Sequence, residues 1–98
     1  MTIENFINGK HTPSHGARIP LFEPATGLEY GSLPDSTNED LEEAVNGARN
    51  ARANWATMDG VERGNCLRRL ADLIEAHAEE LIEAEARDNG KTKGLATH

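Results

Sequence analysis

The second half of this 98-residue sequence is dominated by one long helical pattern. Between Leu67 and Ile82 apolar side chains recur at three- and four-residue steps, with charged side chains between them. That period is typical of an amphipathic helix with a single apolar stripe. The stripe needs a covering surface, yet only a few residues follow Gly90, which is expected to end the helix. We therefore expect the covering polypeptide to lie outside this sequence.

The composition predicts a thin core. Leu, Ile, Val and Phe together account for eighteen of the 98 residues. A domain of this length buries only roughly 60 to 70% of the surface that its unfolded chain exposes. Each uncovered Leu or Ile forfeits roughly 1.5 to 3 kcal/mol that full burial would contribute. We therefore expect low stability for the chain by itself.

The charge balance excludes several classes of partner. Seventeen acidic and ten basic residues give a formal charge of −7, which repels a phosphate backbone. We expect no nucleic-acid partner and no membrane partner. No apolar run reaches the length of a membrane span, and residues 1–8 lack the apolar core of a signal peptide, so a cytoplasmic location is predicted. The single cysteine, Cys66, excludes an internal disulfide.

The order of patterns along the chain predicts an α+β fragment, a single partial domain over residues 1–98. Residues 1–34 combine short extended runs with turns such as Asn8-Gly9, which predicts a small antiparallel meander. A first helix is expected over residues 37–55, where Ser36 or Thr37 can cap the helix and Glu39 or Asp40, three residues on, can complete a capping box. A long second helix is expected over residues 59–88, and residues 91–98 would begin a truncated third helix.

Two patterns resemble parts of binding sites, and each has a simpler interpretation. Residues 89–92, Asn-Gly-Lys-Thr, end like a phosphate-binding loop, but Glu85 stands where that motif needs another glycine. Helix termination is the preferred interpretation. His11 and His15 have a spacing that binds metals on a helix, but the surrounding Pro and Gly residues indicate a loop. We interpret both as solvated loop histidines.

The remaining candidates for catalysis are isolated. Cys66 lies inside the second helix without a histidine base at helical spacing, so a structural thiol is favoured over a nucleophile. His77 has no second histidine four residues later, and the paired acids of the helices face water. No Gly-x-Gly-x-x-Gly pattern follows a strand. The sequence therefore predicts no catalytic, cofactor-binding or metal-binding residue in this chain.

An ordered set of short segments nevertheless resembles the N-terminal region of the aldehyde dehydrogenase family. The segments span almost the whole chain: Phe6-Ile7-Asn8-Gly9-Lys10, Pro24-Ala25-Thr26-Gly27, Asp40-Leu41-Glu42-Glu43-Ala44-Val45, Trp55 to Gly64, Leu70 to Glu75, and Asp88-Asn89-Gly90-Lys91. The opening Glu4 to Lys10 and the late Ala84 to Thr92 look most like the branch that acts on hydroxy- or aminomuconic semialdehydes.

The resemblance implies an enzyme of several hundred residues that uses NAD or NADP. Its cysteine nucleophile and glutamate base would lie far beyond residue 98, and Cys66 does not stand in the family's catalytic motif. The thiolate would attack the aldehyde, hydride would pass to the nicotinamide, and water would hydrolyse the thioester. The strands and helices of this chain would form the outer N-terminal part of the α/β cofactor domain.

Two main hypotheses follow. In the first, the chain is an N-terminal piece of an aldehyde dehydrogenase, inactive alone, whose partner is the remainder of the enzyme. In the second, it is a small non-enzymatic binding or assembly module that uses the same stripe on another apolar protein surface or on a second copy. A small hydrolase that uses Cys66 or a histidine lacks both a base and a pocket. The stripe comprises Leu67, Leu70, Ile74, Leu81 and Ile82.

Overall fold

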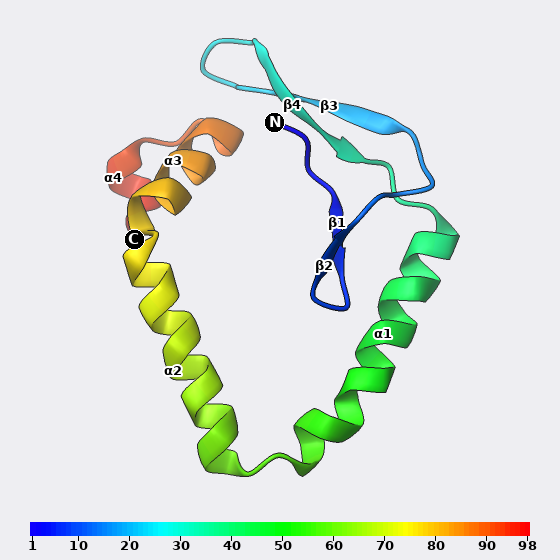
Figure 1. Cartoon of the computed structure of the whole chain (residues 1–98). Coiled ribbons are helices and arrows are strands. Elements are labelled where there is room, and N and C mark those ends of the chain that lie inside the picture. Colours follow the sequence, from blue (N-terminus) through cyan, green and yellow to red (C-terminus); the bar gives the residue numbers. More distant parts are fainter. The chain divides into compact units, whose positions relative to one another are not determined.

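The computed structural model describes residues 1–98 as four short strands followed by four helices (Figure 1). The strands pair as two separate two-stranded sheets, β1 with β2 and β3 with β4. The predicted order of short antiparallel strands followed by helices is confirmed, but the strands do not join into one meander. The elements are β1 (Asn5–Ile7), β2 (Lys10–Thr12), β3 (Arg18–Phe22), β4 (Glu29–Pro34), α1 (Asn38–Thr57), α2 (Gly60–Ala76), α3 (Ala78–Asn89) and α4 (Lys93–Ala96).

The chain divides into two compact units. The first unit contains residues 1–21 and 29–57, and the second contains residues 22–28 and 58–98. Ile7 is the only buried hydrophobic residue, so each unit has very little apolar core. The single partial domain over residues 1–98 stays a prediction.

A tight hairpin packs against α1 in the first unit. Asn8 and Gly9 form the two-residue turn, with φ angles of 55° and 74°, as the Asn-Gly pair predicts. Ile7, at the end of β1, is 8% exposed and lines a hollow with Ala44 and Gly47 of α1. Gly47 is buried beneath the Asn8 side chain, and a Cβ at that position would come within 2.5 Å of Asn8 Oδ1. The hairpin tip therefore needs a glycine in α1 for its close approach.

Hydrogen bonds fix the N-terminal segment beside β4. The Ile3 amide donates to the Ser32 carbonyl at 2.9 Å, and the Ser32 amide donates to the Met1 carbonyl at 3.0 Å. The Arg18 guanidinium, from β3, donates to the carbonyl oxygens of Ile3 and Ser32, both at 2.7 Å. One side chain thus joins three segments of the first unit through main-chain oxygens, where no apolar core is available.

The start of α1 is fixed by a reciprocal capping box, formed by Thr37 and Asp40, one of the two pairs that the spacing allows. The Asp40 amide donates to Thr37 Oγ1 at 3.3 Å, and the Thr37 amide donates to Asp40 Oδ2 at 2.8 Å. Asp40 also accepts hydrogen bonds from the Ser14 hydroxyl at 2.5 Å and from the His15 amide at 3.3 Å. The carboxylate therefore caps a helix and holds a loop that lies far from it in sequence.

The second unit departs from the single long helix expected over residues 59–88. The helix is interrupted at His77, whose φ of −108° and ψ of 19° end α2 and begin α3. The His77 amide still donates to the Leu73 carbonyl at 3.0 Å. The apolar period continues through the interruption, with Ile74 before His77 and Leu81 after it. Hydrophobic periodicity therefore does not reveal that the helix is interrupted.

The end of α3 has the predicted cap. Gly90 takes the left-handed conformation, with a φ of 79°, and its amide donates to the Ala86 carbonyl at 3.0 Å. Thr92 Oγ1 then accepts from the Leu95 amide at 3.3 Å and caps the single turn of α4. The Lys93 ammonium binds Glu83 at 2.7 Å, which holds this turn on α3.

The loop at Gly16 should not tolerate a side chain. An ideal Cβ at Gly16 would collide with the carbonyl oxygen of Asp35, a main-chain atom that cannot swing away. We expect Gly16→Ala to lower the free energy of unfolding by about 1 to 3 kcal/mol, the usual cost of overpacking. Urea unfolding at low temperature, followed by circular dichroism, measures this change.

Gly64→Ala is the matched control, because a Cβ at Gly64 in α2 would meet no atom within 4 Å. That variant should gain roughly 0.5 to 1 kcal/mol through the helix preference of alanine. Equal effects of the two substitutions would contradict the collision at Gly16.

Candidate functional site

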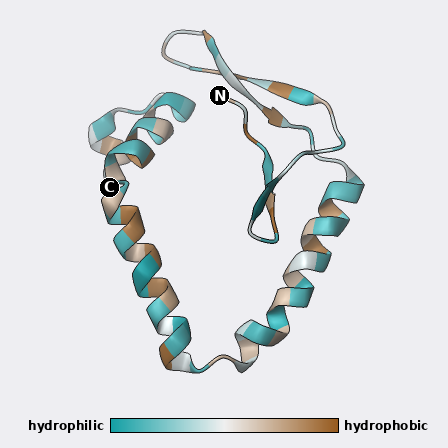
Figure 2. Cartoon of the chain, in the orientation of Figure 1, coloured by the Kyte–Doolittle hydropathy of each residue, from teal (hydrophilic) through white to brown (hydrophobic).

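The main functional feature of the chain is apolar helix surface that its own residues leave uncovered. In Figure 2, hydrophobic residues, coloured brown, alternate with hydrophilic residues, coloured teal, along the helix ribbons. In α2, Leu67, Leu70 and Ile74 are 61%, 53% and 50% exposed. In α3, Leu81 is 49% exposed and Ile82 is partly covered. The residues of the predicted stripe are therefore all present on helices, and four of the five are exposed.

A similar face occurs on α1. Leu41 and Trp55 are 59% and 45% exposed, and Val45 lies on the same face one turn after Leu41. Exposed apolar residues at helical spacing are the usual sign of a surface that binds another protein surface.

One cluster of potential metal ligands forms beside the start of α1. The ligand atoms of His15, Asp40 and Glu43 lie within 4.8 Å of one another, and His15 Nε2 is 3.9 Å from Asp40 Oδ1. However, both oxygens of Asp40 already accept hydrogen bonds from Ser14, His15 and Thr37. The positive end of the α1 dipole also opposes a cation here. The geometry fits a capping and loop-anchoring role.

Both histidines that were predicted as solvated loop residues are exposed, but His11 lies in strand β2 and only His15 lies in the loop that follows it. The His11 ring packs edge-on against Phe6, with centroids 5.3 Å apart and an interplanar angle of 70°. His15 instead lies beside Asp40. The capping-box spacing reveals the position of Asp40 in the sequence, but no local pattern indicates that residues 14–16 return to it.

The hydrogen bonds around Asp40 lower the pKa of its carboxyl group. Hydrogen bonds from the Ser14 hydroxyl and the Thr37 amide stabilise the carboxylate and lower the pKa of Asp40 from 3.8 to about 2. The carboxylate is 3% exposed. In the second unit, the Lys93 ammonium lowers the pKa of Glu83, and the Lys91 ammonium lowers the pKa of Glu85. All three acids therefore belong to structural contacts.

The other candidate site residues lie on different parts of the second unit. Cys66 is exposed on α2, several residues after the helix start at Gly60. His77 lies at the junction of α2 and α3, with Nδ1 3.3 Å from Glu80 Oε2. The Asn89 to Thr92 segment ends α3 and caps α4, as predicted for helix termination.

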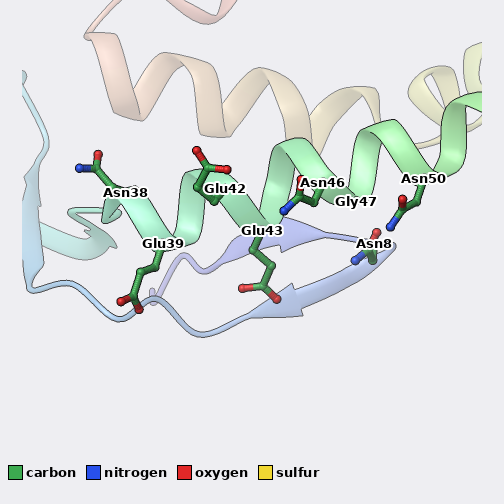
Figure 3. A pocket seen from close by; sticks show the side chains of 8 residues that line it. All are labelled: Asn8, Asn38, Glu39, Glu42, Glu43, Asn46, Gly47 and Asn50. Atoms are coloured by element: carbon green, nitrogen blue, oxygen red, sulfur yellow. The ribbon is translucent and has the colours of Figure 1, made fainter.

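A hollow lies along α1 and the hairpin tip (Figure 3). Its volume is about 610 Å³, and its walls carry only amide and carboxylate side chains around Gly47. The lining contains no histidine, cysteine or lysine. The lining residues are Asn8, Asn38, Glu39, Glu42, Glu43, Asn46, Gly47 and Asn50.

No helix of the structure combines the length and the apolar character needed to cross a membrane.

The low pKa of Asp40 predicts a loss of stability in acid. A carboxyl whose pKa is lower in the folded chain stabilises it above the unfolded pKa of 3.8, and this contribution is lost as pH falls through about 2. We therefore expect the free energy of unfolding to decrease between these two pH values. Unfolding by urea across this range measures the slope.

Asp40→Asn should remove part of that slope, since Glu83 and Glu85 contribute to the same acid response. Asp72→Asn, on an exposed position of α2, is the matched control for loss of one carboxylate. An unchanged slope in the Asp40 variant would contradict the role assigned to this side chain.

Comparison with known proteins agrees with this geometry. The model of the aldehyde dehydrogenase family matches residues 11–98. Among curated relatives, the 2-aminomuconic semialdehyde dehydrogenase of Bos taurus is 43% identical over 96 residues, which cover 98% of this chain and 20% of the relative. The betaine aldehyde dehydrogenase of Cereibacter sphaeroides is 43% identical over 88 residues, covering 89% of this chain and 18% of that protein.

Solved structures give the same result. An NAD-dependent aldehyde dehydrogenase from Sinorhizobium meliloti superposes with a TM-score of 0.92 at 31% identity, covering 99% of this chain and 20% of that one. An aldehyde dehydrogenase variant from Bacillus cereus has a TM-score of 0.92 at 38% identity, with the same coverage of both chains. The present chain spans about one fifth of the length of these proteins and matches their N-terminal part. The chain belongs to the aldehyde dehydrogenase family.

Proposed function

We propose that this chain is the N-terminal scaffold segment of an NAD(P)-dependent aldehyde dehydrogenase and has no activity alone. The observation that carries the proposal is the exposed stripe of α2 and α3 in a chain that corresponds to one fifth of its relatives. In this proposal Leu67, Leu70 and Ile74 pack on the remaining four fifths of the enzyme, which supplies the reacting groups.

The residues of this chain do not fit a dinucleotide. Its sheets have only two strands each, and a cradle for a pyrophosphate requires a glycine-rich turn between a parallel strand and a helix start. The three left-handed glycines lie instead in the hairpin turn, the turn between β3 and β4, and the cap of α3. We therefore assign NAD or NADP to the rest of the enzyme. The Sinorhizobium meliloti neighbour is described as NAD-dependent, which supports NAD.

We extend the proposal to substrate and location. The parent reaction is oxidation of an aldehyde to a carboxylic acid. Four vertebrate relatives, 40 to 43% identical, carry the name 2-aminomuconic semialdehyde dehydrogenase, which supports a semialdehyde substrate. A relative named betaine aldehyde dehydrogenase reaches 43% over a shorter match, so the support for this branch comes from the number and coverage of the matches. The cytoplasmic location stays a prediction.

The exposed stripe also favours a second candidate function. A binding or assembly module would place the same Leu and Ile residues on an unrelated protein or on a second copy. The two candidates differ in what the stripe recognises. The first requires selectivity for an aldehyde dehydrogenase that lacks its own N-terminal fifth.

Mixing the chain with NAD and an aldehyde should produce no NADH absorbance. Co-expression with the remainder of a 2-aminomuconic semialdehyde dehydrogenase should yield a complex that copurifies, because the stripe then regains its cover. NADH production by the purified complex would also assign the catalytic groups to the remainder. Capture of the chain by an unrelated protein only would favour the module instead.

Leu70→Glu should weaken that complex about tenfold or more, because it places an unpaired charge in an apolar interface. Glu75→Gln, an exposed change on the same helix, is the matched control and should bind like the original chain. Titration calorimetry or quantitative copurification measures both variants. Equal binding by both would remove the stripe from the interface.

A further inference from the structure

We infer that Asn8, at the tip of the β1–β2 hairpin, is the site at which this chain undergoes spontaneous deamidation, and that the product loosens the hairpin from α1. The inference concerns a chemical modification and is independent of the proposed function. It rests on a comparison of three Asn-Gly pairs that share one sequence but differ in environment: Asn8-Gly9, Asn46-Gly47 and Asn89-Gly90.

The reaction requires only water. The main-chain nitrogen of the glycine loses its proton and attacks Cγ of the asparagine, so a new C–N bond forms as the Cγ–Nδ2 bond breaks. The side-chain nitrogen takes up a proton and leaves as ammonia. Water then opens the resulting five-membered succinimide at either carbonyl, which gives aspartate or isoaspartate. Glycine favours the step because it has no Cβ to obstruct the approach of its nitrogen. The attacking amide must be free of hydrogen bonds and able to move.

Two of the three pairs are protected by the structure. Asn46 and Gly47 lie inside α1, where the amide belongs to the helical ladder, and Gly47 is buried. At the end of α3, the Gly90 amide donates to the Ala86 carbonyl at 3.0 Å. The Asn89 side chain is also fixed there, since it donates to Glu85 at 2.8 Å and accepts from the Lys91 amide at 2.9 Å.

The Asn8-Gly9 pair has neither form of protection. Both residues are exposed, and the Gly9 amide makes no turn or cap hydrogen bond of the kind made by Gly90. The turn joins strands of only three residues each, so its opening disrupts few contacts. Asn8 can therefore reach the reactive geometry through a local opening that leaves α1 intact.

The product would disturb the packing of the hairpin. The Asn8 side chain lies over Gly47 and lines the hollow of Figure 3, which Glu39, Glu42 and Glu43 also line. Conversion to an acid adds a negative charge to this acidic surface, where like charges repel. Isoaspartate also adds a methylene group to the main chain of a two-residue turn that sets the strand register. Both products weaken the contact between the hairpin tip and α1.

The test compares the three pairs within one molecule. The full chain is incubated in mildly alkaline buffer, folded in one sample and in denaturant in the other, and peptide mass spectrometry follows each asparagine. In denaturant the three should convert at similar rates. In the folded chain Asn8 should convert at least roughly tenfold faster than Asn46 and Asn89, since only these two require helix opening. Similar rates for Asn8 and either helical asparagine in the folded sample would overturn the inference.

The structural consequence has its own pair of variants. Asn8→Asp mimics one product, and Asn54→Asp adds the same charge to α1 away from the hairpin. Amide hydrogen exchange of β1 and β2 should become severalfold faster in the first variant and remain unchanged in the second. Equal exchange in both variants would refute the loosening of the hairpin.

Discussion

Hydrogen bonds to a few buried or shared groups hold this chain together, because it has almost no apolar core. Ile7 is its only buried hydrophobic residue, whereas Asp40 accepts from three other residues and Arg18 donates to main-chain oxygens of two segments. Such networks are specific in direction but contribute little net stability, since each replaces hydrogen bonds to water. They fix local geometry without supplying the energy that a globular domain of this size needs.

The small core is consistent with the family assignment, because a segment of a longer enzyme is expected to have little core of its own. An aldehyde dehydrogenase is about five times as long as this chain, as the coverage of its relatives shows. In the proposal made above, the apolar side chains of α2 pack on the rest of such an enzyme, so recognition and stability would come from the same leucines and isoleucines. The contacts around Asp40 and the helix caps would then fix only local geometry.

Most local structure could be predicted from the sequence, because its signals are local. Asn8-Gly9 marks the hairpin, Thr37 and Asp40 mark the start of α1, and Gly90 marks the end of α3. The exposed stripe of Leu67, Leu70 and Ile74 could also be predicted from its helical period. The interruption at His77 was not, since it changes the main chain at one residue and leaves the apolar spacing undisturbed.

Contacts between distant segments could not be predicted in the same way. The sequence gives no sign that Ser14 and His15 meet Asp40, because their separation of about 25 residues has no periodic signature. The His15, Asp40 and Glu43 cluster was missed for that reason, and the separate sheets were read as one meander. The absence of a catalytic site stays a prediction, because reactive groups are defined by what surrounds them in the complete enzyme.

The junction at His77 interrupts the helix without a loss of main-chain pairing. The His77 amide donates to the Leu73 carbonyl at 3.0 Å, and the His77 carbonyl accepts from the Leu81 amide at 3.1 Å. One residue can therefore break the regular geometry of a helix while both of its main-chain polar groups remain hydrogen-bonded.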